Sequence, residues 1–508
     1  MSLRHWPLGQ PGPVGSDLKI AFATPELLSL VRRTNLAEIA EYLPRNLAQN
    51  KANVVIFLPF TKDIDAKQFN QLNRIGDLDI KLGDGPATKV TYWEGILGDL
   101  RVILVDHPQA FENKHPYGDE EGPYPDNWWR YALFSKAVLE GFALADFKPD
   151  VIHCLDWTLG LLPVYHQMHY AGRKDHPTGR AGTYMGIHNR AMQGSFEREI
   201  LPKIGMPHDL FRAIEGIELA GKVNYLKAGA EFATVIGTHL PHQVLQLDRF
   251  RRGDGLDDSF HRRQKEWVGV QNGVDYRQWD PLTDPLLEQN YGPGDEDLAG
   301  KRKCKTALQE QYNLDKSPRT PIILVLERFD TDNGFDILVD AITPLLERNV
   351  QLIMMGPGQP EIIERLHMIE QTFPGRCKVI EGYNVHAAHQ ILAGADALLM
   401  PAHNYSTHAL AAIAMRYGTP PLCFQNNGLE DTVIDVSQKP KHGNGFTFKK
   451  FTTDGVIEGI DTLRDAYKHP ADWNTLVQRC LKSDFSWDAC AKEYIKAYRR
   501  VTRRVRGR

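Results

Sequence analysis

Six cysteines are the first side chains whose spacing limits the chemistry of this chain. No two of them form a Cys-x-x-Cys pair, and they lie far apart, at Cys154, Cys304, Cys377, Cys423, Cys480 and Cys490. This spacing favours neither a disulfide framework nor a zinc ribbon, and it predicts a reducing compartment, with the cytoplasm as the expected location. No apolar run approaches the roughly 18 residues that span a bilayer, so no membrane partner is expected.

Basic side chains gather in one place, the last ten residues RRVTRRVRGR. They could contact a phosphate or an acidic partner, but a solvated helix end is the simpler interpretation. The formal net charge of the 508-residue chain is -4, which argues against a dedicated nucleic-acid binder. At the other end, residues 1–17 have no apolar segment of the kind found in signal peptides and are expected to form an unstructured leader.

Short apolar runs alternate with helical patterns along the whole chain. In the first half the predicted strands are LKIAFAT (18–24), NVVIFLPF (53–60), RVILVD (101–106), DVIHCLD (150–156), GTYMGIH (182–188) and FATVIGT (232–238). After a stretch at 276–318 that is predicted to be a connector, the pattern restarts with TPIILVLE (320–327), VQLIMMG (350–356), CKVIEGY (377–383), ADALLMP (395–401) and TPPLCF (419–424). This alternation predicts an α/β protein with two doubly wound parallel sheets, each covered by helices on both faces.

Doubly wound sheets bind ligands outside the carboxyl ends of their strands, near helix N-termini whose amides favour anions. Two such domains facing each other would leave a cleft between those ends. A nucleotide-sugar transferase of the GT-B kind has this architecture, and so do a periplasmic-type binding protein and an epimerase. The pattern alone does not choose among them.

Eight sequence blocks make that choice. In chain order they are HCLDWTLGLLPVY (153–165), GIHNRAMQGSF (186–196), NYLKAGAEFA (224–233), QNGVDYRQWDPLTDP (271–285), CKTALQEQYNL (304–314), GYNVHAAHQILAGADALLMP (382–401), MRYGTPP (415–421) and DFSWDACAKEYIKAYR (484–499). Together they resemble the bacterial glycogen synthase and plant starch synthase family over nearly the whole chain, from residue 18 to residue 500.

The resemblance implies a GT-B fold of two doubly wound parallel-sheet domains facing a cleft. It implies an acceptor-side domain over 18–275, a nucleotide-sugar domain over 276–475, and a last helix within 476–508 that returns to the first domain. It also implies transfer of glucose from ADP-glucose to an α-1,4-glucan with retention at the anomeric carbon. Family members use no metal, so neither metal nor cofactor is expected, and cationic side chains and amides must stabilise the leaving diphosphate.

Several family site positions are matched in this sequence. The resemblance places His188 next to the reacting sugar, and it places Asp156 in an Asp-Trp pair. In the family a histidine precedes this pair, and Leu155 replaces it here. Arg328 corresponds to the family's arginine on the donor phosphates. Two further donor-site positions match at Asn272 and Tyr383.

Other family positions have changed. The N-terminal loop Lys-Thr-Gly-Gly-Leu-Gly-Asp aligns with 32–38, where Arg32 replaces the lysine and all three glycines are lost. Glycine suits such a loop because the backbone must approach the diphosphate closely and could need a positive φ. Asn333 replaces the lysine that pairs with the donor arginine, Tyr405 replaces the donor-sugar glutamate, and His408 replaces a glycine at a phosphate-facing helix start.

These changes leave two hypotheses. In the first, the chain keeps the family fold and binds a glucan or a protein partner, while its binding of a nucleotide sugar is weak or altered and its glucosyl transfer is lost or strongly reduced. In the second, it is an active retaining glucosyltransferase with a rebuilt nucleotide-sugar site. A coupling enzyme that uses the GT-B cleft for a non-glycosidic bond is a third, weaker alternative.

The roles of four residues stay open at this point. Arg32 could replace the lost lysine, since arginine binds phosphate well. His408 could bind phosphate, or it could simply cap or pack at its helix start. His188 could be a structural residue of an abandoned site, and Arg328 could pair with Asp330 or Glu327 instead of a ligand.

Overall fold

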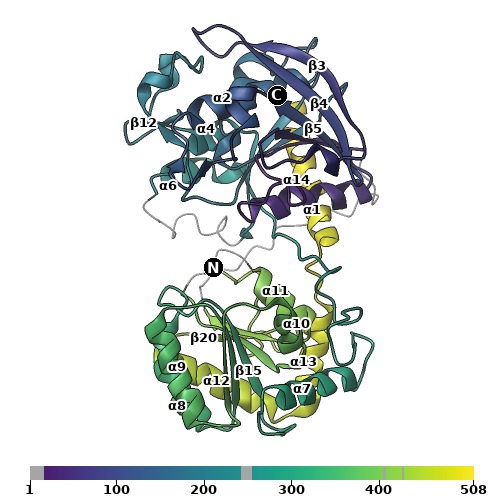
Figure 1. The fold of residues 1–508 in the computed structure, drawn as a ribbon, viewed down its shortest axis with the longest axis vertical. Helices are drawn as coiled ribbons and strands as arrows, with labels where there is room; N and C mark the ends of the chain where they lie inside the picture. The colour runs from purple at the N-terminus through teal and green to yellow at the C-terminus, as the bar shows by residue number, and fades with distance from the viewer. Residues whose placement is uncertain (1–16, 242–253, 404, 406–407, 426–427, 508) are drawn as a thin grey trace. The chain divides into compact units, whose positions relative to one another are not determined.

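The computed structural model describes residues 17–241, 254–403, 405, 408–425 and 428–507. The chain forms two compact units, the first made of residues 1–271 with 487–508 and the second of 272–486 (Figure 1). Nearly all of the expected leader 1–17 lies outside the described residues. No helix in the described residues is long and apolar enough to cross a membrane.

In the described part of unit 1, nine strands form one sheet in the order β14-β13-β9-β8-β1-β2-β5-β4-β3. The parallel strands are β1 (Lys19–Ala23), β2 (Asn53–Pro59), β5 (Leu100–Asp106), β8 (Val151–Leu155), β9 (Gly182–Ile187), β13 (Val235–Thr238) and β14 (Trp267–Gly269). The predicted strands of the first half of the chain are all present.

Two long antiparallel strands, β3 (Leu72–Ile80) and β4 (Thr88–Leu97), extend this sheet at one edge. The sequence analysis did not predict them. Their residues are mostly half-buried or exposed, so they lack the continuous apolar run that marks a strand covered on both faces. The described part of unit 1 also has two small sheets. One pairs β6 (Gly118–Asp119) with β7 (Gly122–Pro123), and the other has three strands in the order β10 (Ser195–Phe196), β12 (Lys222–Asn224) and β11 (Glu218–Leu219).

Helices cover both faces of the unit 1 sheet, and β1 shows why. Its residues alternate between two cores, with Ile20 and Phe22 in one and Ala21 and Ala23 in the other. The first core includes side chains of α1 (Leu36–Gln49) and α14 (Trp487–Arg506), and the second those of α2 (Asn127–Gly141), α3 (Leu161–Tyr165) and α4 (Tyr225–Phe232). A short helix, α6 (Asp257–Arg262), packs against α4.

The last helix belongs to unit 1 although it follows the whole of unit 2 in sequence. It packs on α1 and β9, and its Tyr498 hydroxyl lies 2.8 Å from His153 Nδ1 in the buried strand β8. Because Gly182 has no side chain, Val501 of this helix can lie directly over the start of β9.

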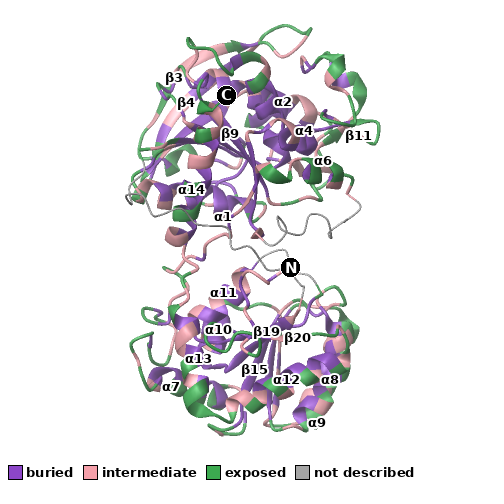
Figure 2. Cartoon of the chain, turned by 180° about the vertical axis from the view of Figure 1, so that it is seen from behind, coloured by how far each residue is buried: buried purple, intermediate pink, exposed green. Residues whose placement is uncertain are grey.

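Unit 2 contains six described strands in the order β17-β16-β15-β18-β19-β20, all parallel. They are β15 (Ile322–Leu326), β16 (Gln351–Gly356), β17 (Cys377–Glu381), β18 (Ala397–Met400), β19 (Pro421–Phe424) and β20 (Phe446–Phe448). The described helices are α7 (Ala299–Gln311), α8 (Phe335–Leu346), α9 (Pro360–Thr372), α10 (Val385–Gly394), α11 (Ala409–Arg416), α12 (Thr453–Tyr467) and α13 (Pro470–Lys482). Figure 2 shows the buried strands enclosed by helices whose outer faces are exposed.

The stretch 276–318 is not the plain connector that was expected. It contains α7, and its first part is fastened to unit 2. Trp279 stacks on His389 of α10 with ring centroids 4.0 Å apart, and Asp284 bonds both His389 and Tyr417. These buried polar contacts compensate for the weak apolar pattern that suggested a connector.

Candidate functional site

Asp156 stands immediately after β8, where strands of this kind deliver ligand-binding groups. Its backbone is strained, with φ 54° and ψ -168°, a region that non-glycine residues rarely occupy. Its Oδ1 accepts hydrogen bonds from the amides of His188 at 2.8 Å and Asn189 at 3.3 Å. Burial, reinforced by the negative charge of Glu26, nevertheless raises the pKa of Asp156 to about 7. The carboxyl group can therefore hold or release a proton near neutral pH.

His188 follows β9, the neighbouring strand, and its ring stacks on His239 with centroids 5.3 Å apart. Burial, followed by the charges of His239 and His153, lowers the pKa of His188 well below its usual value, so the ring is neutral. Among the described residues, neither of its ring nitrogens has a hydrogen-bond partner. A neutral imidazole with both nitrogens unused can donate one hydrogen bond to a ligand and accept another.

Glu26 is a buried carboxylate that follows β1 at the same edge of the sheet. It accepts hydrogen bonds from the Arg33 amide at 2.6 Å, the Thr34 amide at 2.7 Å, the Thr34 hydroxyl at 2.7 Å and the Tyr117 hydroxyl at 2.5 Å. Sequence reasoning missed this residue, although an acidic side chain just after a buried strand is a detectable signal. Glu26 thus satisfies two amides of the loop at 32–38 from within the chain.

The loop itself does not use the conformational freedom of glycine. Asn35, which stands at a predicted family glycine position and at the N-cap of α1 without a side-chain capping bond, has φ -67° and ψ -9°, in the right-handed region. The basic side chains of the loop are also engaged. Arg32 forms an ion pair with Glu38 at 2.8 Å, and Arg33 forms one with Asp63 at 2.9 Å.

In unit 2, the loop between β15 and α8 is organised by Asp330. Its Oδ2 pairs with Arg328 Nε at 3.0 Å, and its Oδ1 accepts bonds from the Asn333 amide at 3.0 Å and the Asn333 side chain at 2.7 Å. Of the two acidic partners that were open for Arg328, the structure therefore shows Asp330. At the end of the loop Gly334 has φ 80°, and a Cβ there would lie 2.3 Å from the Pro401 carbonyl oxygen, so the loops after β15 and β18 touch.

The other acidic neighbour, Glu327, pairs with Tyr405 instead. The Tyr405 hydroxyl oxygen accepts a hydrogen bond from the Ala402 amide at 3.3 Å. The hydroxyl proton is therefore left to form the hydrogen bond with the Glu327 carboxylate. The pKa of Glu327 is raised to about 7, chiefly by burial; the hydrogen bond from Tyr405 opposes this rise, and the negative charge of Asp330 adds to it. Sequence reasoning considered Glu327 only as a partner for arginine and missed this pair.

His408 stands at the N-cap of α11, but its side chain does not cap the helix. Its Nε2 lies 2.8 Å from the carbonyl oxygen of Asn272, and its ring packs near Phe485, so it ties the start of unit 2 to this helix. The Asn272 side-chain oxygen is buried without a hydrogen-bond partner among the described residues. Tyr383, after β17, is 56% exposed and its ring is accessible.

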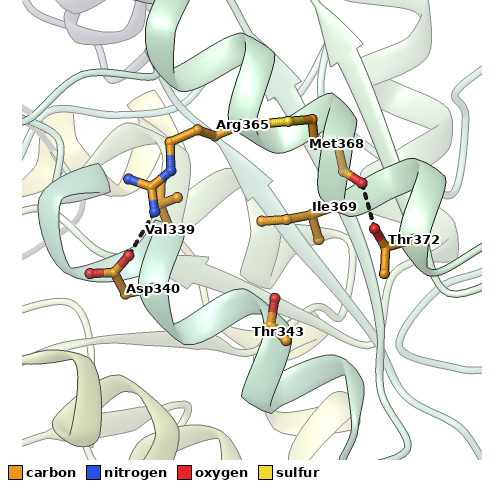
Figure 3. A pocket seen from close by; sticks show the side chains of 7 residues that line it. All are labelled: Val339, Asp340, Thr343, Arg365, Met368, Ile369 and Thr372. Atoms are coloured by element: carbon orange, nitrogen blue, oxygen red, sulfur yellow. Dashed lines mark hydrogen bonds and ion pairs between the residues drawn. The ribbon is translucent and has the colours of Figure 1, made fainter.

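Two surface hollows of unit 2 lie away from these residues. One, of about 320 Å³, is lined by α8 and α9, and the ion pair of Asp340 with Arg365 spans it at 2.8 Å (Figure 3). The other, of about 530 Å³, lies between the segment 286–288, α7 and α10. In the described part of the chain, no group of three or more His, Cys, Asp or Glu side chains could hold a metal ion.

Comparison with known proteins identifies the family. Residues 19–262 match the starch synthase catalytic domain, and residues 308–476 match glycosyl transferases group 1. A glycogen synthase of Geotalea daltonii is 31% identical over 484 residues, which cover 95% of this chain and 99% of the relative. Glycogen synthase 2 of Geobacter sulfurreducens is also 31% identical, over 96% of this chain and 100% of the relative. The chain belongs to the glycogen synthase family.

Solved structures agree with this assignment. The catalytic domain of starch synthase IV from Arabidopsis thaliana, bound to ADP and acarbose, matches with a TM-score of 0.77 and 26% identity, over 96% of this chain and 100% of that one. A sucrose-phosphate synthase from Thermosynechococcus elongatus, at 16% identity and a TM-score of 0.53, shares the fold. The predicted α/β class with two parallel-sheet domains of the GT-B type is confirmed.

For this glycogen synthase homologue, the family positions fall into two groups. Asp156 and His188 lie side by side at the carboxyl edge of the unit 1 sheet, where the His188 backbone amide donates a hydrogen bond to Asp156 Oδ1. Arg328, Asn333, Tyr405 and Glu327 gather on two touching loops at the carboxyl edge of unit 2. Arg32 belongs to unit 1.

Proposed function

We propose that this glycogen synthase homologue has lost, or retains only weakly, the transfer of glucose from ADP-glucose to an α-1,4-glucan. In this proposal the chain binds a glucan or a protein partner through the family fold, and nucleotide sugars bind it weakly. The coarser assignment, a glycosyltransferase of the glycogen synthase type, follows from the family itself. The proposed loss of glucosyl transfer depends on whether the basic side chains are paired within the chain or available to a ligand.

One observation carries the proposal: the arginines at the family's phosphate-binding positions are paired with carboxylates of the same chain. Arg32 pairs with Glu38, and Arg328 pairs with Asp330. Asn333, at the lysine position, carries no charge and is bonded to the same Asp330. A diphosphate at these arginines would share each guanidinium with a carboxylate that already offsets part of its positive charge, so its charge-assisted contacts would be weaker.

The expected size of the defect follows from general values. Removing one donor that stabilises transition-state charge typically costs about 2.7–4 kcal/mol, or ~10²–10³ in rate. The changes at the positions of Asn333, Tyr405 and His408 each affect a group near the same ligand. Even if each cost only ~2 kcal/mol, the rate would fall by about 10⁴, although such contributions are not additive.

Two measurements test the proposal. Incorporation of labelled glucose from ADP-glucose into glycogen should remain at background, and calorimetry with ADP, UDP and GDP sugars should detect weak binding or none. Turnover comparable with that of an active family member, or tight binding that depends on the sugar, would overturn it. The same chain should still bind glycogen or maltooligosaccharides if its role is glucan binding.

A second candidate function is an active retaining glucosyltransferase with a rebuilt donor site. The geometry of Asp156 favours it, because a strained, buried carboxyl with a pKa near 7 beside a neutral histidine is costly to maintain without use. This candidate requires a nucleotide sugar whose charge is met by other groups. Calorimetry across the three nucleotide classes separates the two candidates directly.

A further inference from the structure

The loop from β15 to the first turn of α8 is strongly acidic for a segment at a phosphate-binding position. It carries Glu327, Asp330, Asp332 and Asp336, with Arg328 as its single basic residue. The single guanidinium is already paired with Asp330. Coulomb repulsion in such a partly buried setting acts directly against a diphosphate.

The same edge offers groups that suit hydroxyls. Glu327 is half-buried and accepts a hydrogen bond from the Tyr405 hydroxyl, whose oxygen accepts a hydrogen bond from the Ala402 amide. The carboxylate is therefore fixed in place, with lone pairs left for further donors. Asn333 is fixed in the same manner by its two bonds to Asp330, which leaves its side-chain oxygen available as an acceptor.

An exposed aromatic ring completes the set. Tyr383 follows β17, and β16 lies between β17 and β15 in the sheet. Since neighbouring strands lie about 4.8 Å apart, the ends of β17 and β15 are roughly 10 Å from each other. A ligand with two or three linked rings could reach both Tyr383 and the acidic loop. Rings that are apolar on their faces and hydroxylated at their edges fit a site made of a few polar groups and an aromatic surface.

We propose that the carboxyl edge of the unit 2 sheet binds an uncharged saccharide, through Glu327, Asn333 and Tyr383, in place of a nucleoside diphosphate. Glu327 is the residue that sets this specificity, because its carboxyl group accepts sugar hydroxyls and, in its ionised form, repels phosphate. The inference rests on the proposed function and deepens it by naming the ligand class and the residues of unit 2 that take it.

The experiment compares maltoheptaose and ADP as probes on the full chain. Calorimetry is done at pH 8.5, above the pKa of Glu327 of about 7, so that its carboxylate is charged. The proteins compared are the unchanged chain, Glu327→Gln and Tyr383→Ala. Glu347→Gln is the matched control, because Glu347 is an exposed glutamate just after α8 in the same unit. We expect Glu327→Gln to weaken maltoheptaose binding about tenfold, the loss of a charge-assisted hydrogen bond, and to strengthen ADP binding. Tyr383→Ala should weaken maltoheptaose severalfold, and the control should change neither.

Hydrogen exchange locates the bound sugar. Maltoheptaose should slow exchange of amides in 327–336, and this protection should disappear in Glu327→Gln. Protection confined to unit 1, unchanged maltoheptaose affinity in both variants, or no maltoheptaose binding at all would each overturn the inference. These results differ from failure of the proposed function, which ADP-glucose turnover by the unchanged protein reports. Thermal unfolding of both variants verifies that they are folded.

Discussion

The carboxyl edges of the two sheets differ in how many of the family's predicted site residues they retain. In unit 1, Asp156 and His188 keep the family residue types, and the carboxylate of Asp156 is fixed by two backbone amides. In unit 2, Asn333 and Tyr405 stand at the positions predicted to hold the family lysine and glutamate, and the Glu327 carboxylate is hydrogen-bonded to the tyrosine. Unit 1 also differs from the family pattern, in the loop at 32–38, but its pair of Asp156 and His188 is retained, whereas both of these unit 2 positions are replaced.

The contrast extends to how each edge is held. The unit 1 edge depends on Arg130, a fully buried guanidinium that donates to the carbonyl oxygens of Ala110, His115 and Pro116. That segment leads directly into Tyr117, which bonds Glu26. The unit 2 edge depends on Asp330, a half-buried carboxylate. We infer that unit 1 preserves a rigid site, whereas unit 2 tolerates substitution.

The largest expected effect comes from rebuilding the unit 2 edge. Asn333→Lys alone should give no measurable ADP-glucose turnover, because Tyr405, His408 and Glu327 remain. The combination Glu327→Ser, Asn333→Lys, Tyr405→Glu and His408→Gly should raise turnover by up to about 10⁴-fold. It removes the Glu327 carboxylate, adds a lysine cation, clears the imidazole from the start of α11 and returns a glutamate to the donor-sugar position. Incorporation of labelled glucose into glycogen measures both.

Asp156→Asn in the combined variant serves as the control and should abolish the restored activity. Substantial turnover from Asn333→Lys alone would show that the tyrosine and histidine are harmless, and the comparison between the two edges would break. Because His408→Gly removes the bond to the Asn272 carbonyl, the unfolding temperature of the combined variant must be followed.

The next effect is the pH dependence of stability caused by Asp156. Its pKa rises from 3.8 to about 7 on folding, so between these values the folded chain holds a proton that the unfolded chain has released. The free energy of unfolding therefore falls as the pH rises through this window, by up to about 4 kcal/mol. Asp156→Asn should remove this fall, as measured by urea unfolding at pH 4.5 and at pH 7.5.

Asp209→Asn, at an exposed aspartate of unit 1, should leave the pH dependence unchanged. Glu327→Gln provides the counterpart in unit 2, where the same sign and a smaller amplitude are expected because Glu327 is less buried than Asp156. Equal pH profiles for the unchanged chain and Asp156→Asn would mean that the carboxyl ionises freely in the folded state.

Much of the fold could be predicted from the sequence, because buried parallel strands leave a simple signal. VQLIMMG became β16, and DVIHCLD became β8 with Asp156 just beyond its end. The antiparallel strands β3 and β4 were missed because half-exposed strands lack an apolar run. The helix α7 was missed inside the stretch taken for a connector, since it carries many charges and its packing depends on partners distant in sequence.

The candidate site was predictable only where residue type alone was informative. The family pattern pointed to Arg328 and Asn333, but not to their shared partner Asp330, because that geometry depends on how the loop turns. Glu26 and Glu327 were missed for a related reason. Their roles arise from contacts with residues 7 to 91 positions away, and their position just after a strand does not show those contacts.

A smaller effect tests the rigidity of the two edges. Arg130→Met should lower the free energy of unfolding of unit 1 by about 3 kcal/mol, because it leaves buried carbonyl oxygens without donors. Asp330→Asn should cost unit 2 only about 1 kcal/mol, since the Arg328 side chain is 63% exposed. Hydrogen exchange of each unit measures the two changes separately. Arg180→Met, at an exposed position, is the control, and equal losses in the two units would contradict the comparison.

The smallest effect concerns Arg32, which could have replaced the family lysine. Its ion pair with Glu38 is largely exposed, at 58% and 39% of the two side chains, so Arg32→Ala should change stability by less than about 0.5 kcal/mol. Since the guanidinium is paired within the chain, the variant should also change ADP affinity by less than twofold. Glu38→Ala tests the role of Arg32 more directly, because it removes the ion-pair partner and leaves the Arg32 guanidinium in place. If ADP binding strengthens in Glu38→Ala and weakens in Arg32→Ala, then Arg32 binds phosphate after all, and unit 1 supplies the positive charge that unit 2 lacks.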